Sequence, residues 1–517
     1  MEQVSVDPKK FDPNVILNLI SRAKGDGLGY TEYFDGAKDY MQELTGSVWE
    51  KYENILNKEK ALDFDDLLLK TAKILAKNER IRKHYGERWK YIHVDEYQDT
   101  NRVQYKIIKY LAESHHNICV VGDADQNIYS WRGATIENIL NFEKDYPETK
   151  IIVLEKNYRS TKTILAAANF VIAKNRLRKK KNLYTDNDQG EKISLNVSYS
   201  ETEEARNISE TARSLIEKGA SPRNIAVLYR TNFQSRVLEE SFIKKSIPYQ
   251  LVGVRFFERK EVKDILSYIR AALNRESWSD INRIINTPTR GIGKATVAKI
   301  ASSREDLLPP AMKIKIANFW KILEDIRREI MEKKPSETVR FVIEETGISK
   351  SLHQDGDSES EERLLNIQEL ASLATQYDHL PPEEGIEALL SNAALATDQD
   401  DLEKDKEAVK LMTVHASKGL EFEYVFIAGL EQDLFPFKHT DEKDINEAEE
   451  EEERRLFYVA LTRAKKKVFL SYAIIRTIYG AQRVSAPSEF IEDIDASLIE
   501  EQVPEKPSGA KALFIDF

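Results

Sequence analysis

Short apolar runs that end in polar motifs recur along this chain, and they constrain its fold more than any other feature. The first is Tyr91–Val94, and Asn117–Val121 and Lys150–Leu154 follow it. Helix-like stretches separate these runs, as in parallel β-sheets whose strands are joined by helices. Further runs continue the pattern at Ile193–Val197, Ile225–Tyr229, Val409–Val414, Tyr424–Gly429 and Lys467–Tyr472. The sequence therefore predicts an α/β fold.

Two adjacent carboxylates, Asp95 and Glu96, follow the first run where its strand should end. Ligands of open α/β sheets bind at the carboxyl ends of the strands. One carboxylate with phosphate oxygens and waters is a usual shell for Mg²⁺, and a second carboxylate can orient or deprotonate a water. The alternative is a solvated acidic turn, which is the commoner fate of such a pair.

Gly122–Ala134 follows the second run and contains Gln126, Tyr129 and Trp131. A glutamine beside the carboxylate pair can sense a phosphate or a water, and exposed aromatic rings are natural platforms for stacked bases. The alternative is that Trp131 belongs to the core.

Three more polar motifs can be interpreted as parts of a binding or catalytic site. Tyr158 and Arg159 follow the third run, where arginine offers a planar fork to phosphate oxygens. His415 follows the Val409–Val414 run, and Arg463 ends a helix-like stretch from which it can act as an arginine finger. The alternatives are a surface ion pair for Arg159 and a structural histidine for His415.

Composition describes a soluble globular chain, with 41% hydrophobic and 32% charged residues among 517. No run approaches the ~20 apolar residues of a membrane span, and the N-terminus is not a signal peptide, so we expect a cytoplasmic protein without a membrane partner. The single cysteine, Cys119, excludes an intramolecular disulfide and is expected to be a buried strand thiol. The net charge of −11 argues mildly against a nucleic-acid partner, although binding needs only a local basic groove.

Together these motifs resemble those of the UvrD/Rep/PcrA family of superfamily one DNA helicases. Val94–Thr100 (V-D-E-Y-Q-D-T) resembles the Walker B motif of that family, and Gly122–Ala134 its motif III. Leu154–Ser160 resembles motif IV, Thr413–Phe422 motif V, and Tyr458–Ala464 motif VI. The resemblance covers essentially the whole chain from about residue 15.

The resemblance implies two RecA-like parallel-sheet domains, the first incomplete, with helical inserted subdomains. Residues 1–64 would be a remnant of the helical insert of the first domain, and residues 65–156 the C-terminal part of that domain. Residues 157–254 and 406–498 would form the second domain, residues 255–405 its helical insert, and residues 499–517 a flexible tail.

The resemblance also implies an ATP and Mg²⁺ site between the two domains. Asp95 would hold Mg²⁺, Glu96 would activate water, and Gln126 would couple the γ-phosphate to DNA. Arg159 and Arg463 would clamp the transition-state charge, Tyr158 would stack on adenine, and Glu421 would contact the ribose.

Single-stranded DNA and single/double-strand junctions are the implied partners, in repair or replication, with movement 3′ to 5′. Trp131 and Tyr129 would stack on bases, and the residues near the strand would be Arg132, His415 and Phe64. Gly291 and Gly293 would let a turn approach duplex phosphates, with a helix cap as the alternative.

The family's Walker A loop, G-x-x-x-x-G-K-[ST], has no counterpart in the sequence. Its amides and lysine cradle the phosphates of the nucleotide. The sequence is thus compatible with a helicase truncated at its N-terminus, with one half of a split enzyme whose Walker A comes from an N-terminal fragment or second chain, or with a DNA-binding module without ATPase activity.

Overall fold

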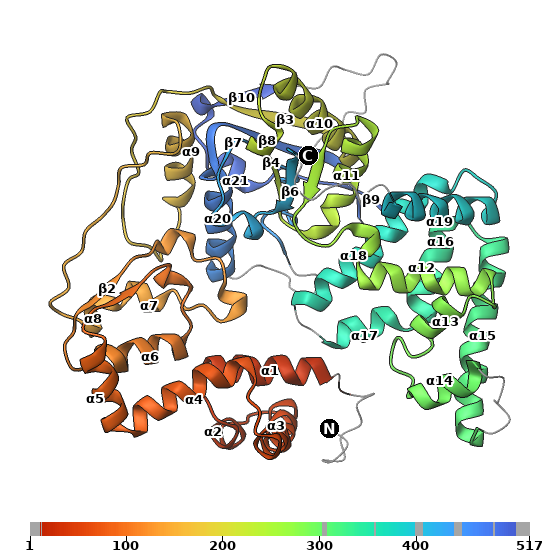
Figure 1. The fold of residues 1–517 in the computed structure, drawn as a ribbon. Coiled ribbons are helices and arrows are strands. Elements are labelled where there is room, and N and C mark those ends of the chain that lie inside the picture. The colour runs from red at the N-terminus through yellow and green to blue at the C-terminus, as the bar shows by residue number, and fades with distance from the viewer. Residues whose placement is uncertain are drawn as a thin grey trace. The chain divides into compact units, whose positions relative to one another are not determined.

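The computed structural model describes residue 11 and residues 13–301, 308–355, 358–398, 407–438, 447–478 and 481–502. They divide into two compact units (Figure 1). Unit 1 comprises Met1–Ile152 and Phe257–Asp401, and unit 2 comprises Val153–Phe256 and Leu402–Phe517. Parallel sheets with many helices confirm the predicted α/β class.

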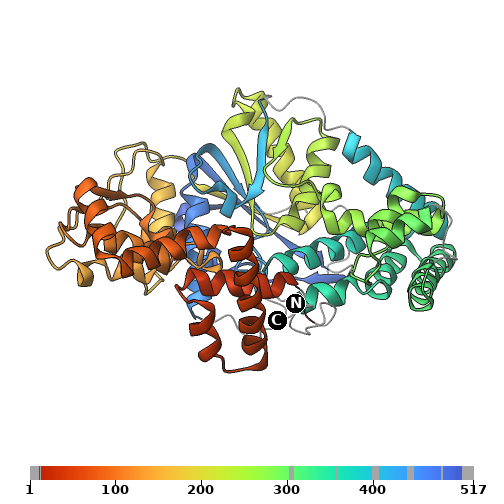
Figure 2. The same ribbon diagram turned by 60° about the horizontal axis from the view of Figure 1, so that its bottom comes forward.

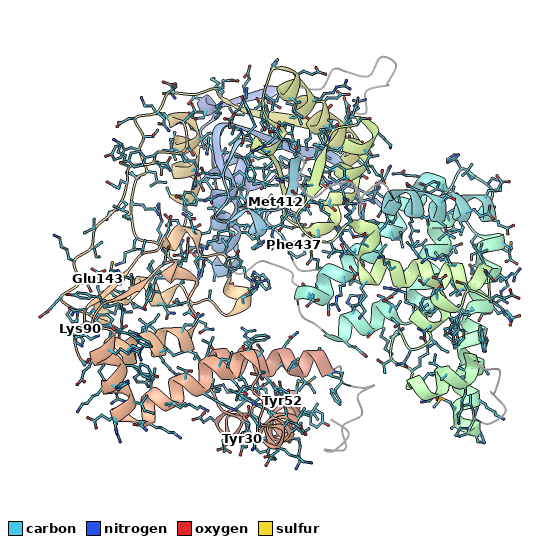
Figure 3. All side chains as sticks on the ribbon, viewed as in Figure 1. Tyr30, Tyr52, Lys90, Glu143, Met412 and Phe437 are labelled. Carbon is cyan, nitrogen blue, oxygen red and sulfur yellow. The ribbon has the colours of Figure 1, made fainter. Side chains whose placement is uncertain are left out.

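Unit 1 begins with four helices, seen from another side in Figure 2: α1 (Pro13–Gly25), α2 (Tyr30–Asp35), α3 (Tyr40–Glu59) and α4 (Phe64–Lys77). Asp63 caps α4 by accepting the Asp66 amide at 2.7 Å. The Lys24 ammonium is buried between three carboxylates, of Glu53, Asp63 and Asp66, whose hydrogen bonds and charges raise its pKa against the opposing effect of burial. The Tyr52 hydroxyl, labelled in Figure 3, also donates to Asp63, at 3.0 Å.

A two-stranded sheet follows α5 (Glu79–Arg88). Strand β1 (Ile92–Val94) pairs in parallel with β2 (Ile118–Val120), so that His93 lies opposite Cys119. Helix α6 (Arg102–Ala112) joins the strands and contacts β1. Two short helices, α7 (Glu137–Leu140) and α8 (Phe142–Asp145), complete this part of the unit.

Two predictions about this sheet are wrong. Cys119 is exposed rather than buried, because it lies on a face of the sheet that the described residues leave uncovered. The predicted strand Lys150–Leu154 is not a strand, since its residues pair with no other strand in the described part of the chain. An apolar run becomes a strand only where a partner accepts its backbone hydrogen bonds.

The described residues of the predicted helical insert form helices joined by turns. Its helices are α12 (Lys260–Leu273), α13 (Trp278–Ile284), α14 (Lys294–Ala301), α15 (Pro310–Glu332), α16 (Pro335–Glu345), α17 (Ile348–Asp355), α18 (Ser358–Ala374) and α19 (Pro382–Asp398). Side chains from successive helices share a core, in which Ile265, Phe319 and Ile367 are inaccessible to solvent.

Unit 2 is built on an eight-stranded sheet with the order β10-β3-β8-β7-β4-β6-β5, and β9 pairs antiparallel with β8. Its strands are β3 (Ile193–Ser200), β4 (Ile225–Tyr229), β5 (Tyr249–Leu251), β6 (Val409–Thr413), β7 (Phe422–Ile427), β8 (Ala464–Ile478), β9 (Ala481–Val484) and β10 (Ile499–Gln502). Helices α10 (Glu201–Glu217) and α11 (Ser235–Lys244) share one core with this sheet. Helices α9 (Lys162–Ile172) and α20 (Glu447–Leu461) contact one another and strand β8, and α21 (Glu489–Glu492) follows β9.

The predicted flexible tail, residues 499–517, is wrong at its start. Ile499–Gln502 is strand β10 and pairs in parallel with β3 from Ile193 to Asn196. The prediction came from the Pro, Gly and Lys content downstream, and residues 503–517 lie outside the described part. Among the described helices, none combines the length and apolar character that a membrane crossing requires.

Candidate functional site

Asp95 and Glu96 lie exposed directly after β1. Glu96 has a left-handed backbone, with φ of 49°, and its amide donates to Asp95 Oδ1 at 2.9 Å. A non-glycine residue in this conformation is uncommon and is often found at functional sites. The turn thus presents two adjacent carboxylates at the carboxyl end of the strand.

Gln98 is a central residue that the sequence analysis did not single out. Its side chain is fully buried, its Nε2 donates to Glu96 Oε2 at 2.6 Å, and its Oε1 accepts the Asp123 amide at 2.9 Å. In the sequence, the only indication of a role for Gln98 is its position inside the V-D-E-Y-Q-D-T motif. Gln98 therefore connects the motif after β1 with the motif after β2.

Gln126 lies at the other end of this connection. Its Nε2 donates to Asp123 Oδ2 at 2.8 Å, so an unbroken series of contacts runs from Glu96 through Gln98 and Asp123 to Gln126. Gly122 permits the close approach, because a Cβ there would lie 2.5 Å from Gln98 Oε1. The structure thus brings Asp95, Glu96 and Gln126 into one polar cluster.

The predicted stacking residues form a second cluster just beyond, around the short 3₁₀ turn Ser130–Arg132. The Trp131 side chain is 53% exposed, so it is not a core residue. The Arg132 guanidinium lies 4.5 Å from the centre of the Trp131 ring and 5.7 Å from that of Tyr129. Tyr129 is partly buried, which raises its pKa. This cluster offers an aromatic surface with a positive charge beside it.

Phe64 stands apart from these clusters, as the first residue of α4. Its side chain is 90% exposed, although the preceding residue, Asp63, is held by Lys24 and Tyr52. The phenyl ring of Phe64 is thus open to solvent at the start of α4.

In unit 2 the structure joins Arg159 with Glu421. Arg159 Nε donates to Glu421 Oε2 at 2.7 Å, and its Nη1 donates to the Thr462 carbonyl at 3.2 Å. The Lys465 ammonium lies 2.5 Å from the other Glu421 oxygen. Hydrogen bonds from Lys465 and then from Arg159 hold the pKa of the Glu421 carboxyl below its usual range. The neighbouring Tyr158 ring is 78% exposed.

Arg463 lies close to this group but differs in its environment. It is buried, its Nη1 donates to the Leu420 carbonyl at 3.2 Å, and its Nε donates to the Val459 carbonyl at 3.1 Å. Arg159 and Arg463 therefore converge on the adjoining segments around Glu421 and Thr462, one partly exposed and one held by backbone carbonyls.

The other predicted residues lie outside both groups. His415 is partly exposed in the 3₁₀ turn His415–Ser417, directly after β6. Gly291 has φ of 70°, and the Asn286 side chain holds the turn around it by accepting the Arg290 and Ile292 amides. The Gly293 carbonyl accepts the Thr296 and Val297 amides, so this glycine also begins α14, as the helix-cap alternative expected.

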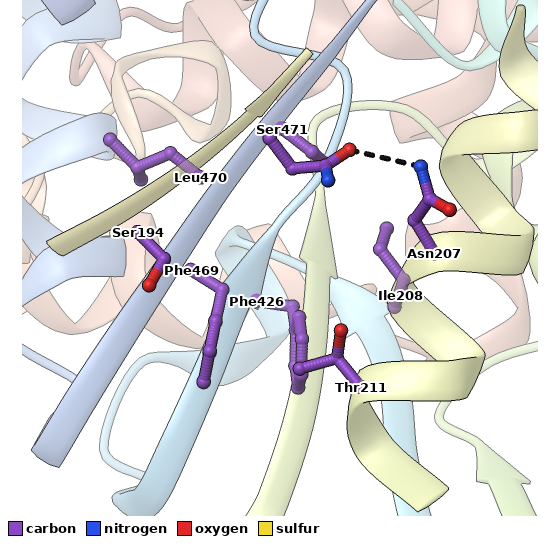
Figure 4. A pocket seen from close by; sticks show the side chains of 9 residues that line it. Ser194, Asn207, Ile208, Thr211, Phe426, Phe469, Leu470 and Ser471 are labelled. Carbon is purple, nitrogen blue, oxygen red and sulfur yellow. Dashed lines mark hydrogen bonds between the residues drawn. The ribbon is translucent and has the colours of Figure 1, made fainter. Parts of the chain in front are cut away.

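The described residues contain no group of three or more His, Cys, Asp or Glu side chains placed to hold a metal ion. A cavity of about 20 Å³ lies elsewhere, between α10 and strands β3, β7 and β8, with room for about one water (Figure 4). Asn207 donates to Asn196 Oδ1 at 3.2 Å across it.

Each unit presents its own group of polar side chains with a distinct chemical character. In unit 1 the hard oxygens of Asp95 and Glu96 suit one-carboxylate coordination of Mg²⁺ and positioning of a water. In unit 2 the arginines suit a phosphate anion, and Tyr158 suits a stacked ring.

Comparisons with known proteins cover nearly the whole chain. Residues 1–147 match the model of the UvrD/REP helicase N-terminal domain, and residues 152–474 match that of the UvrD-like helicase C-terminal domain. The ATP-dependent DNA helicase PcrA of Bacillus subtilis strain 168 is 40% identical over 99% of this chain and 72% of its own length. PcrA of Staphylococcus aureus strain Mu50 is 39% identical over 97% of this chain and 71% of its own length.

Proposed function

Because this chain belongs to the UvrD-like helicase family, we propose that it acts as an ATP-dependent DNA helicase or translocase that moves 3′ to 5′ on single-stranded DNA. The observation that carries the proposal is the contact path from Glu96 through Gln98 to Gln126. Such a path links a water-activating carboxylate with the strand end beside an exposed aromatic cluster. It is suited to couple nucleotide state with DNA contact.

In unit 1, Glu96 would take the proton of the attacking water, and Gln98 would orient the Glu96 carboxylate through its 2.6 Å hydrogen bond. Asp95 would hold Mg²⁺, which when bound supplies positive charge against the phosphate oxygens. Gln126 would report the state of the γ-phosphate to the Trp131 loop.

In unit 2, Arg159 and Arg463 would stabilise the charge that develops on the transferred phosphoryl group. A phosphate would compete with Glu421 for Arg159, and Arg463 would have to exchange backbone carbonyls for phosphate oxygens. Tyr158, which is exposed, would stack on the adenine, and Glu421 would contact the ribose.

The DNA surface would start at Trp131, Tyr129 and Arg132, whose rings and guanidinium can stack on bases. His415 and Phe64 would also lie by the single strand. The turn at Gly291 and Gly293 would approach duplex phosphates at a single/double-strand junction. Repair and replication are the processes that produce such DNA.

No residues of this chain are assigned to a cradle for the nucleotide phosphates, because G-x-x-x-x-G-K-[ST] is absent from the sequence. We propose that a polypeptide outside this sequence, either an N-terminal fragment or a second chain, supplies it. The same absence favours one alternative, a DNA-binding module without ATPase activity.

The test measures ATP turnover with single-stranded DNA, first for the chain alone and then with a P-loop-bearing segment added. We expect no stimulated turnover from the chain alone, because the phosphates have no cradle. With the segment, Glu96→Gln should reduce turnover by about 10²- to 10⁴-fold, whereas Glu87→Gln, at an exposed carboxylate on α5, should not.

Three results would change these conclusions. Turnover by the chain alone that is lost in Glu96→Gln would refute the need for an added cradle. DNA binding without turnover, even with the segment, would favour the binding module. Failure of the chain to bind single-stranded DNA would refute the helicase proposal.

A further inference from the structure

The start of helix α4 is held by a buried ammonium group. Lys24 lies near the end of α1, and its side chain is inaccessible to solvent. Its Nζ donates to Asp63 Oδ2 at 2.8 Å and to Asp66 Oδ1 at 2.9 Å, and it lies 3.0 Å from Glu53 Oε1. An ammonium group has three donors, so these three carboxylates engage all of them. One buried cation thus joins α1 to α3 and to the first turn of α4.

Asp63 uses its two carboxylate oxygens for two different contacts. Its Oδ1 accepts the Asp66 amide at 2.7 Å and so caps α4, whereas its Oδ2 accepts hydrogen bonds from Lys24 and from the Tyr52 hydroxyl. Burial alone would raise the pKa of Asp63, but the hydrogen bonds from Lys24 and from the Asp66 amide hold it below the usual range. The cap is therefore ionised at neutral pH, and donors from α1 and α3 fix its orientation.

The ring of Phe64, the first residue of α4, is oriented by its backbone more than by packing. The side chain is 90% exposed, so neighbouring side chains do little to set its position. Ala61 and Leu62, which precede the cap, are exposed as well, and the first buried apolar residue of α4 is Leu69. The direction of the Phe64 side chain consequently depends on the first turn of α4, which the Asp63 cap holds.

We propose that Lys24 is a positioning residue for DNA binding, which holds the ring of Phe64 in the orientation that contacts a base of single-stranded DNA. This inference rests on the proposed function, in which Phe64 lies by the strand. A ring contributes most to binding when its position is fixed beforehand, because less conformational freedom is then lost in the complex. Lys24 supplies this preorganisation without contacting DNA, since its side chain is fully buried.

The alternative is that the cluster around Lys24 only stabilises the packing of three helices. Removing the cation from buried carboxylates is destabilising in either case, so stability alone does not separate the two roles. They differ in their dependence on Phe64, because a positioning effect disappears when the positioned ring is absent. Glu53 provides a matched control, since it contacts Lys24 from α3 and takes no part in the cap of α4.

The test measures binding of a single-stranded oligonucleotide by fluorescence anisotropy for Lys24→Met and Phe64→Ala, alone and combined. Phe64→Ala should weaken binding about tenfold, and Lys24→Met about fivefold in the chain that keeps Phe64. In the Phe64→Ala protein, Lys24→Met should weaken binding no further, because the ring that it positions is gone. Equal weakening by Lys24→Met in both backgrounds would overturn the proposal.

Two further variants separate positioning from folding. Glu53→Gln removes one charge from the cluster but keeps an oxygen for Lys24, so it should lower the urea midpoint and leave DNA affinity unchanged. Tyr52→Phe removes one hydrogen bond to Asp63 and keeps every charge, so it should weaken binding about twofold. If Lys24→Met fails to fold, Tyr52→Phe takes its place in the cycle with Phe64→Ala. A loss of affinity in Glu53→Gln as large as that in Tyr52→Phe would show that the cluster is structural only.

Hydrogen exchange gives a readout that needs no DNA. Without Lys24, the Asp66 amide, which donates to the Asp63 cap, should exchange at least about tenfold faster relative to the amides beyond Leu69. An unchanged ratio would overturn the proposal. A Phe64→Ala protein that binds DNA normally would overturn the positioning role and leave the helicase function standing on Trp131. Failure of the unmodified chain to bind single-stranded DNA would overturn both.

Discussion

The two parallel sheets of this protein contain similar strand sequences but differ in what covers them. In unit 2, β4 runs I-A-V-L-Y and every one of its residues is fully buried, because strands flank it and helices cover it. In unit 1, β1 and β2 pair only with each other among the described residues, and both leave their central residue exposed.

The difference shows that the burial of a parallel strand is supplied by its neighbours and is not a property of its own sequence. The comparison also shows that charged residues at strand ends are exposed in one sheet and buried in the other. The carboxyl end of β1 presents exposed Asp95 and Glu96, whereas β8 of the eight-stranded sheet carries Arg476 in a fully buried ion network.

The comparison predicts its largest effect for one substitution made in both sheets. Val227→Lys, in the middle of β4, should destabilise unit 2 by about 4 kcal/mol or more, because a charge would be buried without a partner. Val121→Lys, at the exposed residue directly after β2, should change stability by less than about 1 kcal/mol. Urea denaturation followed by circular dichroism measures both. If the two variants unfolded alike, Val121 would be covered within this chain, and the contrast between the sheets would fail.

The charged groups at the strand ends of the two sheets should also differ in how much they contribute to stability. Arg476 donates to Glu204 and Glu431, both buried, at 2.5 and 2.6 Å. Arg476→Met would leave two buried carboxylates without their cation and should cost about 3–5 kcal/mol. Asp95→Asn, at the exposed end of β1, keeps an acceptor for the Glu96 amide and should cost less than about 1 kcal/mol.

The control for Arg476 is a variant that removes all three charges. Glu204→Gln and Glu431→Gln added to Arg476→Met should recover most of the lost stability, because the amide oxygens can still accept the surrounding hydrogen bonds. No recovery would mean that packing of the Arg476 side chain, rather than charge, stabilises this end of the sheet.

Local patterns predicted most of the elements. The apolar run Ile225–Tyr229 is β4 as predicted, and the run Val409–Val414 contains β6. These predictions succeeded because strand character depends on neighbouring residues along the chain. Five predicted runs of unit 2 contain or overlap strands β3, β4, β6, β7 and β8, whereas β5, β9 and β10 were not predicted.

The predictions that failed depend on contacts distant in sequence. Burial of Cys119 and strand formation at Lys150–Leu154 each require a partner that the apolar run itself cannot identify. The sequence placed Ile499–Gln502 in a flexible tail, and only its pairing with β3 identifies it as a strand. The roles of Gln98 and of the carbonyls around Arg463 also arise only when separate loops meet.

Trp131 and Trp89 are both exposed, and comparing them tests which surface of unit 1 binds DNA. Stacking on a base contributes roughly 1–3 kcal/mol, so Trp131→Ala should weaken binding to a single-stranded oligonucleotide about tenfold or more. Its thermal stability should stay unchanged, because the ring is already exposed. Fluorescence anisotropy and thermal denaturation measure the two quantities.

Trp89→Ala is the matched control for Trp131. Trp89 is also exposed but stacks on Tyr85, 4.8 Å between ring centres, so its loss should not reduce DNA binding. A Trp131→Ala protein that binds normally and melts much earlier would show that this ring stabilises the fold and does not contact DNA.

The smallest expected effect concerns the exposed end of the eight-stranded sheet, where Glu421 pairs with Lys465 and Arg159. These cations lower the pKa of the folded carboxyl, so its contribution to stability is present above the ordinary glutamate pKa of about 4.3 and is lost as pH falls through the folded value. Glu421→Gln should therefore lower stability at pH 7, by less than about 1 kcal/mol since the pair is partly exposed.

The variant and the unmodified protein should converge in stability when the pH is taken well below that ordinary value, where both side chains are uncharged. Urea midpoints across this range measure the convergence, and a double-mutant cycle with Lys465→Met isolates the pair. Since Lys465 is the main cause of the lowered pKa, Glu421→Gln should have a smaller and less pH-dependent effect in the Lys465→Met background. An effect of Glu421→Gln that stays constant from pH 7 to acid would instead assign it to hydrogen bonding. The charge on Glu421 would then contribute no more to the stability of the eight-stranded sheet than the exposed carboxylates contribute to the two-stranded one.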